Sequence, residues 1–399
     1  MLRMIRFELK KMYSNSVVIG SLAVLLLVCF LILQACCFNN SATSAITPDG
    51  TQLSGREAIM FNQSIAEKYT GDFTDDTIAK MVLDYSTDYP AEYAETVESG
   101  AINSLIPSSY LYLAMFIPPA NYDEIAQDAL SHGTSIPPLT EDGLVSIRDY
   151  GAAYVDKPLQ YGYNDSWAYF FSGFCGQTIA IAFPALIVII IAVSTIFSSG
   201  YSTKMDALIL TTRYGKNRQI IAKLFASMIF TTMIIGGLFI LFCVAFGVQY
   251  GVLGWNADIQ ANLGLSLMGV YLPLNNLQLI FFGLGVVWLA GIFAAAVTAM
   301  ISAVTKTPFS SLIVAFAVFM APWIIRQLLP ESTLRDLLIV FPANAVNAHE
   351  VLLLPVNAQS IFYNQPLAPA LCIAFATIIV LLVSSAITYK AFRNHQAVG

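Results

Sequence analysis

Long apolar stretches alternate with polar segments along this chain. Six of the stretches have about twenty or more residues and few charges, and roughly 20 helical residues are needed to cross a hydrocarbon layer about 30 Å thick. They cover residues 16–38, 167–197, 224–250, 277–304, 308–328 and 367–389. Pro184 and Pro322 fall inside two of them, and these prolines are the expected kink sites. The pattern predicts six transmembrane helices.

The first apolar stretch has a second interpretation. The sequence LQACC, residues 33–37, loosely resembles a lipoprotein cleavage site. The stretch is longer than the apolar region of a typical signal peptide, which has about 7–15 residues. We therefore interpret residues 16–38 as the first transmembrane helix and keep cleavage as the alternative.

The N-terminal residues 1–15 have the spacing of a short amphipathic helix. Apolar side chains recur at three- and four-residue steps, at Leu2, Ile5, Leu9 and Met12. The bases on the adjoining faces are Arg3, Arg6, Lys10 and Lys11. Such a helix can lie at the membrane interface with its bases near anionic lipid.

The largest polar block, residues 39–165, is strongly acidic. It holds nineteen Asp and Glu residues against five Lys and Arg, while the rest of the chain has six acids and fourteen bases. Helix N-terminal signals occur at SGRE (54–57) and before DDTIAKMVLDY (75–85), so the block is expected to be mainly helical. Its eleven tyrosines can form a surface for cationic ligands or contribute to a core.

The distribution of bases sets the orientation. With the N-terminus inside, the segments 1–15, 198–223 and 390–399, together with Lys306, carry twelve bases and two acids, as the positive-inside rule requires. Both termini are then cytoplasmic, and block 39–165 is extracellular. The predicted fold class is an all-α integral membrane protein with six transmembrane helices and a mainly helical extracellular domain between the first and second.

Two further segments lie outside in this topology. Residues 251–276 are nearly free of charge. Residues 329–366 contain two short helical patterns, too short and too polar to span, which can dip into the membrane as re-entrant helices packed on protein. His349 and Glu350 are neighbours there. This pair is a candidate outer gate, with a surface or capping role as the alternative.

The sequence lacks several catalytic signatures. It has no GxxxxGK[ST], HExxH or CxxC motif and only three histidines, so we expect no catalytic residues, no metal site and no enzyme activity in this chain. No nucleic-acid partner is expected. The six apolar stretches show almost no charge, whereas ion-coupled carriers need charged groups within the membrane. If the protein moves a substrate uphill, another chain is expected to supply the energy.

The loop between the second and third apolar stretches is the most basic one. It reads STKMDALILTTRYGKNRQIIAKLFA, residues 202–226, with a short helix at 204–210, a turn rich in Thr and bases at 211–218, and a helix entering the next span with Lys223. This order, after a basic start, one span and a large outer segment, resembles the permease subunits of ABC-2 type transporters of Gram-positive bacteria. The family has six spans.

The resemblance implies a mechanism and a set of partners. Two permease subunits, identical or homologous, pair in the bacterial plasma membrane. Each presents the loop, called a coupling helix, to one of two separate ABC ATPase subunits, which bind ATP and Mg. The residues expected to contact the ATPase are Lys204, Met205, Asp206, Leu208, Ile209, Thr211, Thr212, Arg213, Tyr214, Gly215, Lys216 and Arg218. The alternative is that these bases only set the topology.

The function implied is ATP-driven export. The expected cargo is an amphipathic peptide, antimicrobial or bacteriocin-like, or a lipid-like molecule, because the spans carry little charge. The alternatives are a membrane receptor or immunity protein that captures an extracellular ligand without transport, and an ion efflux permease.

Overall fold

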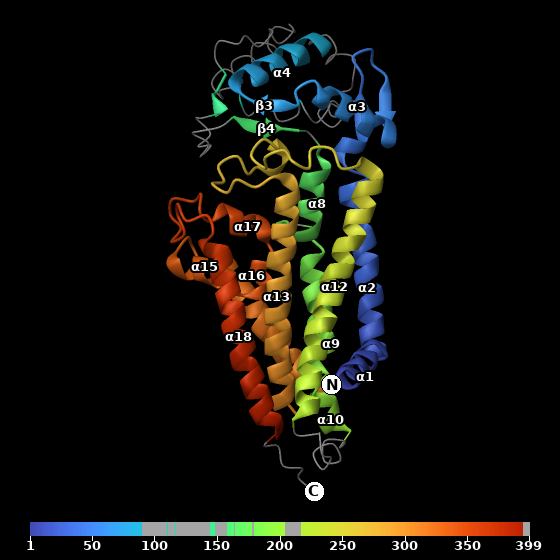
Figure 1. Ribbon diagram of the computed structural model, residues 1–399, viewed down its shortest axis with the longest axis vertical. Helices are drawn as coiled ribbons and strands as arrows, with labels where there is room; N and C mark the ends of the chain where they lie inside the picture. Colours follow the sequence, from blue (N-terminus) through green and yellow to red (C-terminus); the bar gives the residue numbers. More distant parts are fainter. Residues whose placement is uncertain are drawn as a thin grey trace. The chain divides into compact units, whose positions relative to one another are not determined.

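Five helices are long and apolar enough to cross a membrane in the computed structural model of the chain (Figure 1). The structure describes residues 1–89, 110, 116, 144–147, 158–162, 164–177, 179–203 and 217–393. The five helical segments are Ser16–Phe38, Arg218–Tyr250 (α12), Asn276–Val304 (α13), Pro308–Leu328 (α14) and Ala368–Arg393 (α18). The described part is mostly helical, and five such helices are compatible with a multi-pass membrane protein.

The prediction of six continuous spans is not confirmed. The stretch predicted at 167–197 consists of two helices, α8 (Ser166–Cys175) and α9 (Ala182–Ser194), separated at residues 176–181. The thirteen residues of α9 extend about 20 Å at 1.5 Å per residue, which is less than the ~30 Å of a hydrocarbon layer. Pro184 lies in the first turn of α9, where its missing N–H has no helical acceptor in any case. The stretch therefore breaks before Pro184, where a kink was predicted.

Contacts divide the chain into two units, which are described separately. The first unit comprises Met1–Ile32, Ser172–Cys243 and Phe281–Gly399, and the second comprises Leu33–Phe171 and Val244–Ile280. In the first unit, α9 is largely enclosed, with nine of its thirteen residues buried. A helix that is apolar on all sides belongs in an interior.

Close packing of α12 on α13 stabilises the first unit. A Cβ added to Gly291 of α13 would lie 2.5 Å from Ile235 Cδ1 and 2.9 Å from Thr231 Cγ2, both on α12. Any larger residue there would force these side chains to move, because protein interiors have few voids. Gly285, on the same helix, has no atom within 4 Å of an added Cβ.

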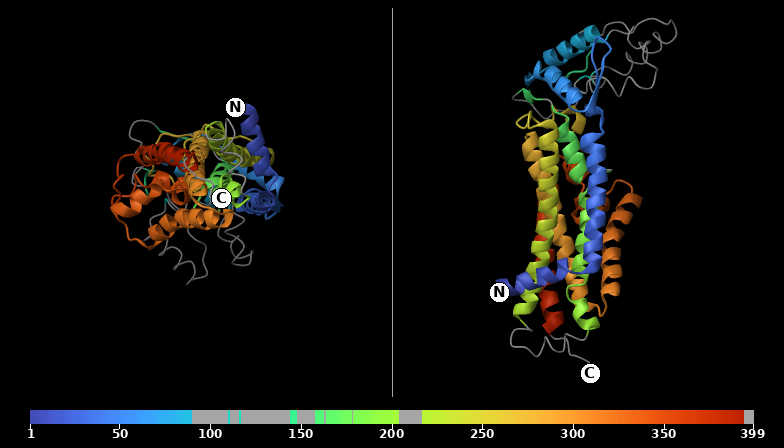
Figure 2. Two further views of the ribbon diagram at one scale, coloured as in Figure 1. Left: turned by 90° about the horizontal axis from the view of Figure 1, so that it is seen from below. Right: turned by 90° about the vertical axis from the view of Figure 1, so that its right-hand side faces the viewer.

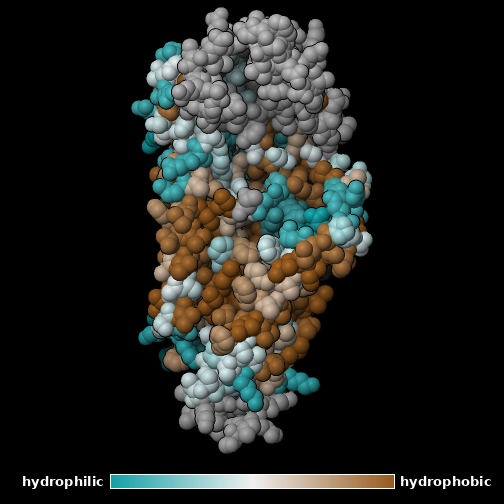
Figure 3. Space-filling view, turned by 180° about the vertical axis from the view of Figure 1, so that it is seen from behind, coloured by the Kyte–Doolittle hydropathy of each residue, from teal (hydrophilic) through white to brown (hydrophobic). Residues whose placement is uncertain are grey.

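Three of the long helices are mainly exposed in this single chain. Only 28% of the apolar window of α2 (Ser16–Leu33), and 17% of those of α14 and α18, is buried, against 61% for α13. Their exposed side chains are large and apolar, for example Phe316 and Leu382. Such surfaces are stable against lipid or another membrane chain. Figure 3 shows this apolar surface, with a hydrophilic area gathered over the side that carries α15 and α17.

The segment predicted at 329–366 forms short helices, as expected. They are α15 (Thr333–Leu337), η7 (Leu338–Val340), α16 (Pro342–Ala345) and α17 (Ala348–Leu353). The side-chain oxygens of Ser332 and Asn347 cap α15 and α17. The short helices pack on α14 and α18 (Figure 1).

The N-terminal helix α1 (Leu2–Tyr13) turns away from the axis of α2 (Figure 2). The four predicted interfacial bases Arg3, Arg6, Lys10 and Lys11 are all exposed. Its buried residues are Glu8 and Met12, whereas Leu2, assigned to the apolar face, is 82% exposed. The amide of Gln219 on α12 donates to Glu8 at 3.5 Å. The helix is thus docked on α12 partly by a polar contact that the periodicity did not indicate.

The described part of the second unit combines helices with two small sheets. Its regular elements between α2 and α8 are η1 (Gln34–Phe38), η2 (Ser41–Thr43), β1 (Ser44–Ile46), β2 (Gln52–Ser54), α3 (Arg56–Glu67), β3 (Gly71–Phe73), α4 (Asp75–Asp88) and β4 (Leu159–Tyr161). The sheets are the antiparallel pairs β1–β2 and β3–β4, with Ala45 opposite Leu53 and Asp72 opposite Gln160. A further 3-10 turn, η6, covers Leu263–Leu265, and in the first unit α10 covers Ser198–Ser202.

Two capping predictions in this unit have different outcomes. The Oγ1 of Thr74 accepts the N–H of Thr77 at 3.3 Å, and acidic residues occupy the first turn of α4, as predicted. The capping box predicted at SGRE is wrong. Ser54 lies in β2, and α3 begins after Gly55 without a side-chain cap, because Gly55 has φ +60° and turns the chain between strand and helix.

Candidate functional site

The chain between α8 and α9 is not helical, and this gap begins at Gly176. Gly176 ends α8, and a Cβ at this position would lie 2.5 Å from Ser172 Cα, so only glycine fits. Its N–H donates to Ser172 O at 2.9 Å, and the N–H of Ile181 donates to Gly173 O at 2.9 Å. These bonds satisfy the N–H groups at the two ends of the gap.

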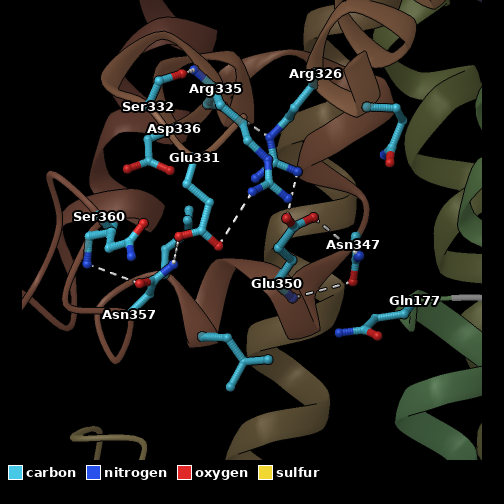
Figure 4. Close-up of a pocket in the computed structure, with 14 residues that line it drawn as sticks. Gln177, Arg326, Glu331, Ser332, Arg335, Asp336, Asn347, Glu350, Asn357 and Ser360 are labelled. Carbon is cyan, nitrogen blue, oxygen red and sulfur yellow. Dashed lines mark hydrogen bonds and ion pairs between the residues drawn. The ribbon is translucent and has the colours of Figure 1, made fainter. Parts of the chain in front are cut away.

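A cavity of about 410 Å³, which we call the polar pocket, lies beside this gap. Its walls come from the end of α14, from α15 and α17, and from the segment 357–360, with Gln177 on the α8–α9 side (Figure 4). The lining residues are Gln177, Arg326, Gln327, Glu331, Ser332, Arg335, Asp336, Asn347, Glu350, Leu353, Leu354, Asn357, Gln359 and Ser360. Five of these fourteen are Arg, Asp or Glu, in a chain where charged residues make up 11%.

An ion pair joins α14 to α17 in this pocket. Arg326 Nη1 lies 2.6 Å from Glu350 Oε1, with the arginine side chain 3% exposed and the glutamate 25% exposed. Arg326 Nε also donates to Arg335 O at 3.0 Å. The side-chain amide and the capping oxygen of Asn347 contact Glu350, at 3.4 Å to Oε2 and 3.3 Å to its N–H. The charge on Arg326 is therefore neutralised where water does not reach it, which a buried arginine requires.

The remaining carboxylates of the pocket also have protein donors. Asp336 accepts the N–H of Ile361 at 2.9 Å. Glu331 accepts the amide of Asn357 at 3.4 Å and lies 3.7 Å from Arg335 Nη1. Arg335 Nε, in contrast, is buried and has no hydrogen-bond partner among the described residues.

An apolar groove of about 720 Å³ adjoins the polar pocket. We call it the apolar groove, and it is lined by Val28, Ile32, Gly176, Gln177, Ile179, Ala180, Phe183, Pro184, Met320, Trp323, Gln327, Ala343, Asn344, Val346, Asn347 and Glu350. Gln177, Gln327, Asn347 and Glu350 line both cavities. Sites for small molecules typically have about 300–1,000 Å³ and combine apolar walls with a few polar groups. The two cavities together meet this description, and we call them the cleft.

One buried acceptor belongs to the groove. Asn344 is 2% exposed, its amide donates to Leu338 O at 2.8 Å, and its Oδ1 has no partner among the described residues. The orientation of the amide is fixed, because its other contact is also a carbonyl, Pro322 O at 3.4 Å.

The two members of the predicted outer gate have different partners. Glu350 pairs with Arg326, while His349 Nδ1 lies 2.8 Å from Gln177 Nε2. Arg326 lies within the predicted span 308–328 and is buried, and it is the single charged residue of the six apolar stretches. The sequence carried a signal for it, since a charge near the end of an apolar stretch marks a functional position by default. Arg335 and Asn344 had no such signal.

The predicted ATPase-contacting loop lies mostly outside the described residues. This holds for Lys204, Met205, Asp206, Leu208, Ile209, Thr211, Thr212, Arg213, Tyr214, Gly215 and Lys216. Arg218 is exposed at the start of α12.

Buried hydrogen bonds and ring contacts join the ends of the helices beside this loop. Lys223 of α12 is 1% exposed, donates to Ile196 O at 2.6 Å and lies over the rings of Phe197 and Phe392. Ser302 Oγ accepts the N–H groups of Phe197 and Ser198, each at 3.1 Å. A lysine at a helix C-terminus can satisfy carbonyls that have no helical donor.

The described tyrosines of the acidic block form a core. Tyr69, Tyr89, Tyr110 and Tyr161 are each less than 10% exposed. Tyr69 donates to Asp84 at 2.7 Å. Burial raises the pKa of Tyr110 to about 12, because a phenolate is poorly solvated there. These rings are not a ligand-binding surface.

Comparisons of the chain with protein-family models, with curated proteins and with solved structures gave no match.

Proposed function

We propose that this chain is the permease subunit of an ATP-driven exporter of the ABC-2 type, with an amphipathic cargo. The observation that carries the proposal is the cleft, because a polar pocket continues into an apolar groove among helices that are apolar enough to lie in a membrane. Such a cleft suits a molecule with one polar and one apolar part. The resemblance of the loop at 202–226 to a coupling helix supports the same function.

The energy source in this proposal is a separate chain. Two ABC ATPase subunits bind ATP and Mg and contact the loop from inside the cell. Met205, Leu208 and Ile209 are the apolar anchors, and the bases around them form rim ion pairs, which contribute under ~1 kcal/mol each. The exposed apolar faces of α2, α14 and α18 are available to lipid and to a second permease subunit.

The experiment tests association with an ATPase. The tagged full chain, with L208D and R213E introduced together, is purified from its native host in mild detergent, beside the unchanged chain. The matched control is K306E, which alters another predicted cytoplasmic base outside the loop. We expect a stoichiometric ATPase chain with the unchanged protein and with K306E, and its loss with the double variant. Retention in the double variant refutes the role of the loop, and no ATPase with the unchanged protein refutes the function.

Capture of an extracellular ligand without transport is the second candidate. It depended on a tyrosine-rich surface, and the buried tyrosines Tyr69, Tyr89 and Tyr110 weaken that motivation. Ion efflux is the third candidate, and the apolar groove does not favour it.

A further inference from the structure

The two parts of the cleft follow one another along α14. Arg326 and Gln327, near the end of the helix, line the polar pocket. Met320 and Trp323, which come earlier on the same helix, line the apolar groove. At 1.5 Å per residue, the helix rises about 9 Å from Met320 to Arg326. One ligand can therefore place a polar head in the pocket and an apolar chain in the groove.

The charges that line the pocket do not balance. Arg326 lies 2.6 Å from Glu350, and Arg335 lies 3.7 Å from Glu331. Asp336 is the fifth charged lining residue, and no Arg or Lys side chain in the described part of the chain forms an ion pair with it. Two arginines against three carboxylates leave a formal charge of −1. A cavity with an excess of one sign attracts ligands of the other, so the pocket favours a cation.

Asp336 is the carboxylate that carries this excess charge. The residue is 7% exposed, and its Oδ2 accepts the N–H of Ile361 at 2.9 Å. Its Oδ1 has no hydrogen-bond donor among the described residues, and the atoms that are enclosed without a partner belong to other residues. This oxygen therefore faces the pocket, where no bond joins Asp336 to another lining residue (Figure 4). A buried carboxylate without a cation is costly, and a cation beside it offsets that cost.

The surroundings of Asp336 favour a head with several N–H donors. The side chains of Glu331 and Glu350 are 45% and 25% exposed, so a ligand can reach both carboxylates. Gln327 and Gln359 add amide oxygens to the lining. A primary ammonium has three donors and no acceptor, which suits a pocket with oxygens on several sides. A trimethylammonium has the same charge and no donor.

The apolar groove fits the chain of such a molecule. The rings of Phe183 and Trp323 lie 6.0 Å apart, and Ile179 and Met320 add aliphatic surface. Its volume of about 720 Å³ falls within the range of small-molecule sites. Glu350 lines both the groove and the pocket. An aromatic face beside a charged pocket also attracts an ammonium group.

We propose that the cleft binds a single-chain amphiphile with a primary ammonium head. Asp336 pairs with the ammonium, the oxygens around it accept its remaining N–H groups, and the groove holds the chain. Identifying this amphiphile as the exported cargo rests on the proposed function. Its binding to the cleft does not require an ATPase, so failure of binding and failure of the ATPase to co-purify are separate outcomes.

The test uses the purified full chain in maltoside detergent and the emission of Trp323, which lines the groove. The probe is a long-chain primary amine with a nitroxide on its chain, which quenches an indole on contact. We expect saturable quenching that W323F removes and that the unlabelled amine reverses. The alcohol of equal chain length should compete about tenfold more weakly, because a hydrogen bond to a charged group contributes more than one between neutral groups. The trimethylammonium analogue should also compete more weakly, and the carboxylate of equal chain length should not compete.

Two variants test the role of the charge. D336N keeps an acceptor for the Ile361 N–H but removes the charge, so it should raise the half-saturating concentration of the amine about tenfold. It should leave competition by the alcohol unchanged, which separates recognition of the charge from uptake by the micelle. R335Q removes a cation from the pocket and should lower the half-saturating concentration about threefold, the range of an exposed charge. The control E67Q changes an exposed carboxylate of α3 outside the cleft and should have no effect.

Several results would overturn the proposal. Equal competition by the amine and the alcohol, or stronger competition by the carboxylate, shows that the head is not a cation. Competition by methylammonium or sodium at the concentration of the amine shows a site for a small cation, without a role for the groove. Quenching that persists in W323F places the probe outside the groove. Unchanged binding in R335Q removes the pocket charge from recognition, and this gain-of-affinity test remains decisive where D336N does not fold.

Discussion

The ion pair between Arg326 and Glu350 gives an asymmetric prediction about stability. E350Q leaves Arg326 charged at 3% exposure without a counterion, and arginine cannot lose its proton in a protein. R326M leaves Glu350, which is 25% exposed and also contacts Asn347, so water can solvate the remaining charge. E350Q should therefore destabilise more than R326M.

The size of each destabilisation follows from how deeply the ion pair is buried. Removing one partner of a fully buried pair costs about 3–5 kcal/mol, and the partial exposure of Glu350 reduces this to about 2–4 kcal/mol for E350Q and about 1–2 kcal/mol for R326M. The double variant R326M/E350Q buries no charge at this position and should be more stable than E350Q alone, since an isolated buried charge costs more than a neutral, well-packed replacement. Its coupling energy should be at least ~1 kcal/mol.

The assay is thermal unfolding of the full chain in detergent, followed by a thiol-reactive dye. Cys29, Cys36 and Cys37 are buried thiols, so they react as the fold opens. The unchanged chain should have the highest unfolding midpoint and E350Q the lowest. The double variant and R326M should lie between them. A midpoint for E350Q at or above that of R326M would falsify the argument from burial.

Three further predictions use the same assay with matched controls. G291A should lower the stability by about 1–3 kcal/mol because its Cβ meets Ile235 and Thr231 of α12. G285A, where an added Cβ has free space, should be neutral or stabilising. Similar losses in both variants would contradict the close packing. K223M should lower the stability by about 1–3 kcal/mol because the Ile196 carbonyl loses its donor. K390M, at an exposed site, should change the stability by less than about 0.5 kcal/mol. Equal effects of the two variants would show that Lys223 does not stabilise this carbonyl. T74A should lower the stability by about 0.5–2 kcal/mol through loss of the N-cap of α4. T87A should change the stability little, because Thr87 Oγ1 bonds back to Leu83 O on the same helix. A neutral T74A would show that the cap does not contribute.

The sequence determined the elements of this fold whose cause is local. Apolar runs predicted five of the long helices within a few residues, and Thr74 caps α4 where the pattern suggested a helix N-terminus. Helix length, hydrophobicity and caps depend on residues a few positions apart, so they can be read along the chain.

Only the tertiary structure decided the site. The gap at 176–181 depends on where α9 packs, although Gly176 and Pro184 are its local markers. Arg326 and Glu350 are twenty-four positions apart and meet because α17 folds back on α14. Whether Arg335 Nε and Asn344 Oδ1 find partners depends on every neighbour around them. Long-range contacts of this kind join segments that share no local pattern, so hydropathy and spacing, which determined the helices, did not show that these residues meet in one cleft.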